Sequence, residues 1–244
     1  MQDNQQQAYD RGITIFSPDG RLYQVEYARE AVSRGSASVG VRTADGVVLG
    51  AVRQARSPLI ERESIEKIHA VDDHVGLASA GHVADARKLV DVARQQAQVE
   101  HLRYDQPVGV ETLTKSITDH VQEYTQTGGA RPFGVALLVG GVEDGDPRLF
   151  ETDPSGTPYE WQATAIGGGS SEARSYLESE YTAGMDLEGG VTLALEALAA
   201  AGNDIDAAGV ELATVDVESG QFRSLPTEDV ATRLDEADIG GEQT

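Results

Sequence analysis

Residues 9–35 read YDRGITIFSPDGRLYQVEYAREAVSRG and say more about the fold than any other stretch of the chain. Ser17 and Asp19 lie in a Ser-Pro-Asp-Gly turn, and both are residue types whose oxygens accept hydrogen bonds from the first turn of a helix. Apolar residues then recur at near-helical spacing until Gly35: Leu22, Val25, Ala28 and Val32. The stretch therefore predicts a tail, a tight turn and a helix before the body of the protein.

The chain is strongly acidic. It has 244 residues and a formal net charge of −22, from 41 acidic and 19 basic residues, and its only lysines are Lys67, Lys88 and Lys115. Such a charge disfavours binding to nucleic acid or to an anionic membrane. Because the charge is spread along the chain, we expect a protein from concentrated salt, where screening acts within ~3 Å at 1 M. The alternative is an ordinary acidic protein.

The composition also predicts where the protein works. Cysteine is absent, which excludes disulfides and thiolate metal sites. Residues 1–8 are polar, and no apolar stretch is long enough to span a membrane. We therefore expect a cytoplasmic protein.

Beyond residue 35 the pattern predicts hairpin-linked strands with pairs of helices between them. Strands are predicted at 36–42, 47–52, 67–71, 75–80, 135–139, 149–151, 160–166, 210–217 and 221–225. Helices are predicted at 110–124, 171–181, 187–201 and 227–236, and from Val83 to Ala97 with Val83, Ala86, Val90, Ala93 and Ala97 on one face. This order suits antiparallel sheets covered by helices, an α+β fold. We expect a tail and turn at 1–20, one domain at 21–237 and a flexible end at 238–244.

Three motifs of the opening stretch stand in a fixed order: Tyr-Asp-Arg, Phe-Ser-Pro-Asp-Gly-Arg-Leu and Gln-Val-Glu-Tyr-Ala. Together they closely resemble the N-terminal signature of α-type subunits of the 20S proteasome. The resemblance covers essentially residues 9–237 and implies the N-terminal-nucleophile hydrolase fold, a four-layer αββα sandwich of two antiparallel sheets. It implies a heptameric α ring that docks on catalytic β subunits, controls the entry of unfolded proteins and receives an activating AAA+ ATPase. It implies no cofactor and no metal.

Catalytic subunits of this family use an N-terminal threonine freed by cleavage after a glycine. Here Ser36 follows Gly35, and Lys67 lies near the place of the catalytic lysine, but Val52 stands where those subunits carry an acidic residue. Cleavage would also remove the α-type signature. We therefore expect a non-catalytic subunit with Ser36 buried in a strand. One alternative is a self-processing hydrolase that uses Ser36, and another is a ring-forming binding module that works without β subunits.

The resemblance also implies a gate. Tyr9, Asp10 and Arg11 match the cluster that orders the tails over the α-ring pore, where an aspartate can hold charge-assisted hydrogen bonds between neighbouring tails. Pro18 fixes φ where the tail leaves the body, and Tyr27 is assigned to the same gate. The pore constriction is assigned to the loop Thr127, Gly128, Gly129 and Ala130; the alternative is an ordinary helix-to-strand turn.

The same resemblance assigns Lys67 and Gly81 to a pocket between adjacent subunits that receives the C-terminal carboxylate of the ATPase. Arg29 and Glu26 are expected to contribute to it from the first helix. The alternative is that Lys67 is a solvated surface lysine. His82 stands where the resemblance implies an apolar residue, so it bears on the lining of that pocket. Residues 167–169, Gly-Gly-Gly, lack the lysine of a P-loop and predict a tight strand-to-helix connection. The five histidines lack metal-ligand spacing.

Overall fold

Two five-stranded antiparallel sheets form the centre of the molecule in the computed structural model, which describes residues 23–126, 131–203 and 205–239. The first sheet has the order β10-β9-β2-β1-β8. Its strands are β1 (Ser38–Arg42), β2 (Gly46–Val52), β8 (Ala163–Ile166), β9 (Val210–Asp216) and β10 (Gln221–Ser224). The second has the order β3-β4-β5-β6-β7, with β3 (Ile68–Asp72), β4 (Val75–Gly81), β5 (Val135–Glu143), β6 (Asp146–Thr152) and β7 (Pro158–Glu160).

The central strands are apolar on both faces, and this pattern produces the layers. Along β5, Leu137 and Val139 face the helices while Ala136 and Leu138 enter a core between the sheets. Strand β2 alternates in the same way: Val47 and Leu49 lie in the core between the sheets and Val48 faces the other helix layer. A strand buried on both faces needs a cover on each side, so two layers of helices complete the fold.

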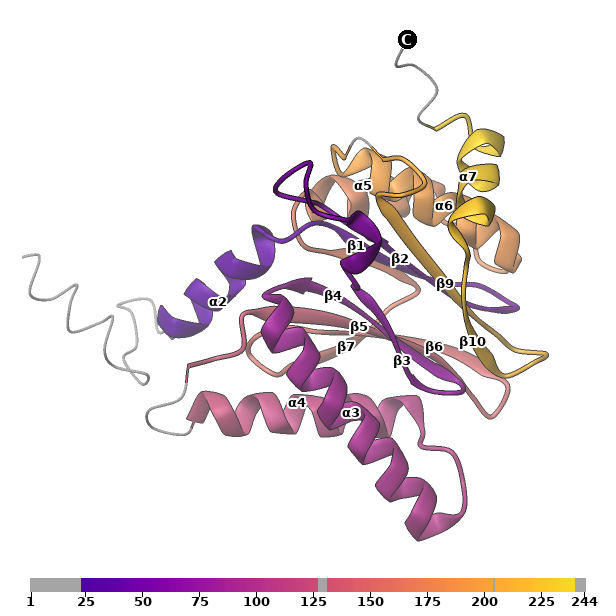
Figure 1. Cartoon of the computed structure of the whole chain (residues 1–244). Helices are drawn as coiled ribbons and strands as arrows, with labels where there is room; N and C mark the ends of the chain where they lie inside the picture. Colours follow the sequence, from indigo (N-terminus) through magenta and orange to yellow (C-terminus); the bar gives the residue numbers. More distant parts are fainter. Residues whose placement is uncertain (1–22, 127–130, 204, 240–244) are drawn as a thin grey trace, which may run out of the picture.

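Helices cover both outer faces (Figure 1). The second sheet carries α3 (Val83–Tyr104) and α4 (Val110–Gln126), and the first carries α5 (Ser170–Glu180), α6 (Leu187–Ala200) and α7 (Thr227–Glu236). A 3-10 turn at Arg62–Ser64 lies in the loop before β3. This arrangement confirms the predicted αββα sandwich. None of the helices in the described part of the chain is long and apolar enough to cross a membrane.

Helix α2 (Tyr23–Ser33) confirms the first predicted helix and lies at one end of the sandwich (Figure 1). It contacts β4 and β5, and it buries Val25 and Ala28. Val32 packs against the core between the sheets, whereas Tyr27 is 49% exposed. The helix thus attaches to the body through a narrow apolar face.

The prediction of one strand at 160–166 is wrong. The segment forms β7 and β8, which belong to different sheets. Between them, Trp161 N donates to Leu149 O in the second sheet, and Gln162 O accepts from Arg42 N in the first. The chain therefore crosses from one sheet to the other at this pair.

Two smaller expectations also fail. Val83 was expected on the buried face of α3 but is 51% exposed, because it opens the helix and its side chain lines cavities instead of the core. Ser36 was expected in a buried strand, but β1 begins at Ser38 and Ser36 is half-buried. The predicted connection at 167–169 is confirmed, since it joins β8 directly to α5.

Candidate functional site

A cavity of about 410 Å³ joins two of the predicted site residues, Lys67 and Gly81. Lys67 directly precedes β3, and Ser79 on the neighbouring strand donates its backbone N–H to Lys67 O at 3.0 Å. Gly81 lies two residues further along β4, at its end. The antiparallel register of β3 and β4 therefore brings Lys67 and Gly81 together.

The Lys67 side chain is buried, with 6% of the residue exposed. Its ammonium donates to Ser36 O at 2.7 Å, to Ser36 Oγ at 2.9 Å and to Ala37 O at 3.1 Å. These three acceptors match the three hydrogens of the ammonium. The alternative of a solvated surface lysine is therefore wrong for this chain, and Lys67 ties β3 to the segment between α2 and β1.

Burial lowers the pKa of Lys67 from 10.5 to about 7, and nearby Glu211 opposes the shift. Glu211 is itself buried, accepts from the backbone N of Lys67 at 2.9 Å and lies 3.5 Å from Arg53 Nε. Lys67 thus changes its charge near neutral pH, whereas an exposed lysine does not.

The Ser36 hydroxyl donates its proton to a backbone carbonyl and not to Lys67. Its Oγ donates to Val52 O at 2.7 Å and accepts from the Lys67 ammonium. The preceding Gly35 is held in place as well, because its carbonyl accepts from Gly168 N at 2.7 Å and an added Cβ would lie 2.5 Å from Gly81 N. A chain that continues through Gly35 leaves Ser36 without the free α-amine that serves as base in this chemistry.

Gly81 is required by the backbone itself. Its φ of +117° is strained for residues with a side chain, and an added Cβ would lie 2.2 Å from Gly134 O. The glycine therefore permits β4, β5 and the end of α2 to pack closely.

His82 lines a different cavity, of about 370 Å³, which also contains Tyr27 and Val83. Its ring lies against Gly134, where an added Cβ would be 2.5 Å from Cδ2. Gln24 from the start of α2 and Arg131 after α4 line the same cavity. His82 is thus absent from the lining of the Lys67 cavity.

Sequence reasoning missed an ion pair at the edge of this second cavity. Arg131 donates two hydrogen bonds of 2.7 Å to the Asp85 carboxylate, which also accepts from Gly134 N at 2.8 Å. Burial by itself raises the pKa of Asp85, but the hydrogen bonds from Arg131 and Gly134 outweigh it and hold this pKa below its usual 3.8. The pair fixes the chain directly after residues 127–130 onto α3.

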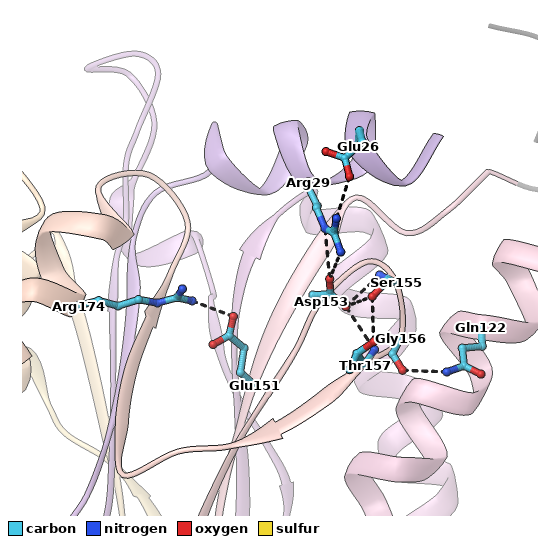
Figure 2. Close-up of polar contacts among 9 residues, drawn as sticks. All are labelled: Glu26, Arg29, Gln122, Glu151, Asp153, Ser155, Gly156, Thr157 and Arg174. Carbon is cyan, nitrogen blue, oxygen red and sulfur yellow. Dashed lines mark hydrogen bonds and ion pairs between the residues drawn. The ribbon is translucent and has the colours of Figure 1, made fainter. Parts of the chain in front are cut away.

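Arg29 lies in a third cavity, of about 320 Å³, and not in the lining of the Lys67 cavity. Figure 2 shows its guanidinium between Glu26, at 2.8 Å, and Asp153, also at 2.8 Å. In the same view Arg174 meets Glu151 at 2.8 Å. Because Asp153 follows β6, Arg29 joins α2 to the turn between β6 and β7.

The remaining site predictions lie outside the described residues: Tyr9, Asp10, Arg11 and Pro18 of the gate, and Thr127, Gly128, Gly129 and Ala130 of the pore loop. Over the described ranges there is no group of three or more His, Cys, Asp or Glu side chains that could hold a metal ion.

Comparisons with known proteins match nearly the whole chain. The proteasome subunit family matches residues 32–215, and the N-terminal signature of proteasome subunits of the A type matches residues 9–31. Proteasome subunit alpha 2 of Haloarcula marismortui is 72% identical over 244 residues, 100% of both chains. Proteasome subunit alpha of Natronomonas pharaonis is 64% identical, covering 97% of this chain and 93% of its own. Proteasome subunit alpha 1 of Haloferax volcanii is 61% identical, and the match covers 96% of this chain and 94% of the Haloferax protein.

Proposed function

Since this chain belongs to the proteasome subunit family, as a member of the non-catalytic α type that assembles with other proteasome subunits, we propose that it gates the proteasome core. In this proposal it forms the outer heptameric ring, docks on a ring of catalytic β subunits and controls the entry of unfolded proteins. The ring also receives the C-terminus of an activating ATPase. The setting is a salt-rich cytoplasm, which suits a net charge of −22 and the haloarchaeal relatives.

The proposal that the ATPase C-terminus docks on this chain is supported by the cavity that both Lys67 and Gly81 line. Because its three hydrogens bond to Ser36 and Ala37, the Lys67 ammonium would attract one terminal carboxylate through its positive charge. Arg29 lies apart from this cavity, so its role in the proposal changes. It holds α2 in place through Asp153.

The gate is proposed at the other end of α2. Gln24 and Tyr27 share a cavity with Arg131 and Pro132, so the start of α2 and the residue that follows the 127–130 loop lie close together. We assign Tyr9, Asp10, Arg11, Pro18 and Tyr27 to the gate, and Thr127 to Ala130 to the constriction. The tail at 1–20 and the end at 238–244 are proposed to flank one domain at 21–237.

Deletion of residues 2–12 tests the gate in the assembled particle with its β subunits. We expect faster degradation of casein and a smaller effect on a tripeptide substrate once the gate is already open, because the pore restricts the bulky chain most. Unchanged casein degradation would reject the gate. Purification of the complex from its host, without any co-purifying threonine protease, would instead favour a ring that works without β subunits.

A further inference from the structure

The side chains that line the Lys67 cavity include three cations, Arg34, Arg56 and Lys67, and no acidic residue among the described lining. Acidic residues outnumber basic ones by 41 to 19 in the whole chain. A concentration of positive charge on so acidic a protein creates a local potential that selects anions.

Two of the three cations already have partners. Arg34 pairs with Glu30 at 3.0 Å, and Lys67 donates its three hydrogens to Ser36 and Ala37. The carboxylate of Glu211, on β9, and the guanidinium of Arg53, directly after β2, lie behind Lys67. Arg56 is exposed and makes no hydrogen bond or ion pair with any residue that the structure describes.

The rest of the lining is partly apolar. Ile60 is 40% exposed and Val83 is 51% exposed, and both line the cavity beside Arg56. Its volume of about 410 Å³ falls in the lower part of the range for ligand pockets, roughly 300–1,000 Å³. It therefore suits a short peptide segment with both charged and apolar groups.

We propose that Arg56 is a second anion-binding residue of this cavity, so that the preferred ligand is a C-terminal peptide with an acidic side chain close to its terminal carboxylate. The inference rests on the proposed docking function. The terminal carboxylate approaches Lys67, the acidic side chain pairs with the planar guanidinium of Arg56, and an apolar side chain contacts Ile60 and Val83.

The test uses assembled rings and fluorescein-labelled heptapeptides that differ only near the end, one ending in Glu-Tyr-Leu and one in Gln-Tyr-Leu. Fluorescence anisotropy measures the Kd for wild type, Arg56→Gln and the control Arg223→Gln, which removes an equal charge from β10, outside the lining of the cavity. We expect wild type and the control to prefer the Glu peptide by about threefold to fivefold, as for an exposed ion pair. Arg56→Gln should bind both peptides with the affinity of wild type for the Gln peptide.

The outcomes separate this inference from the docking function. Equal affinity of wild type for both peptides, or an unchanged preference in Arg56→Gln, overturns the role of Arg56, while loss of binding on C-terminal amidation still supports docking. If the peptides do not bind, or if amidation of their C-terminus does not change their affinity, both the role of Arg56 and the docking function are rejected. Tighter binding of DIGGEQT, residues 238–244 of this chain, would assign the cavity to a second copy and overturn the inferred partner.

Discussion

The Lys67 ammonium donates a 2.9 Å hydrogen bond to the hydroxyl oxygen of Ser36, and this hydroxyl donates its own proton to Val52 O at 2.7 Å. A nucleophilic serine must give that proton to a base, but here the proton goes to a carbonyl oxygen, and Lys67 donates to the hydroxyl instead of accepting from it. The contact instead holds the segment between α2 and β1 against β3.

Ser36→Ala should therefore cost stability and no activity. The variant removes two part-buried hydrogen bonds, one to Val52 O and one from the charged Lys67, of which the second alone is worth about 1.5–3 kcal/mol. We expect a lower Tm for assembled rings and unchanged peptide hydrolysis by the complex with β subunits. Ser175→Ala is the control, since its exposed hydroxyl donates to Ser171 O within α5. Loss of peptide hydrolysis in Ser36→Ala would contradict this account.

The Lys67 amine predicts a pH dependence of stability. Its pKa is lowered from 10.5 to about 7 on folding, so between these values the unfolded chain binds a proton that the folded chain has released. Relative to Lys67→Met, wild type should gain unfolding free energy as pH rises through this window, by at most about 1.4 kcal/mol per pH unit. Below pH 7 both states are protonated and the difference should be flat. Denaturant unfolding at fixed salt measures the unfolding free energy of wild type and Lys67→Met at each pH. Parallel plots of the two free energies against pH would refute the prediction.

Docking should follow the opposite trend. A terminal carboxylate is attracted by the ammonium form of Lys67, so peptide binding by wild-type rings should weaken as pH rises above about 7. Lys67→Ala should lose stimulation by such peptides yet form rings that support short-peptide cleavage at the unstimulated rate. Arg56→Gln, which retains Lys67, should keep the pH dependence. A Lys67→Ala particle that responds like wild type would exclude Lys67 from docking.

Arg29→Gln should loosen α2, because Arg29 carries the ion pair between that helix and Asp153. Hydrogen exchange of the amides of Tyr23–Ser33 should accelerate. Arg34→Gln is a matched control, since Arg34 directly follows α2, its partner Glu30 lies on that helix, and the pair does not reach the body. Equal exchange in the two variants would show that the apolar face of α2 alone holds the helix.

Removal of the first segment tests assembly. Helix α2 buries only Val25 and Ala28 in its own protomer, so we expect it to pack mainly between neighbouring protomers. Deletion of residues 1–34 should abolish rings in sedimentation velocity at high salt. Rings of normal size from that variant would disprove the prediction.

The fold was largely predictable because its signals are local. Runs such as Val47–Val52 and Val135–Val139 are apolar at every or nearly every position, and turn residues separate them. The break at Trp161 and Gln162 carries no such signal, because only their hydrogen bonds to Leu149 and Arg42 divide the segment between the sheets.

The site was less predictable, because its contacts join distant parts of the chain. The pairing of Lys67 with Gly81 follows from one hairpin, but the burial of Lys67 depends on carbonyls 30 and 31 residues away. The ion pair of Asp85 and Arg131 spans 46 residues and has no local pattern. The only hint of this ion pair in the sequence is Arg131 itself, the sole basic residue in the Gly-rich stretch at 128–134.

The most direct test of the central claim, that this α-type chain is a non-catalytic component, is intact-mass measurement of the active complex after treatment with a covalent inhibitor of threonine proteases. We expect every inhibitor adduct on the co-assembled β chains, and an unmodified α chain that still contains residues 1–35. An α chain that begins at Ser36 and carries the inhibitor would contradict the account.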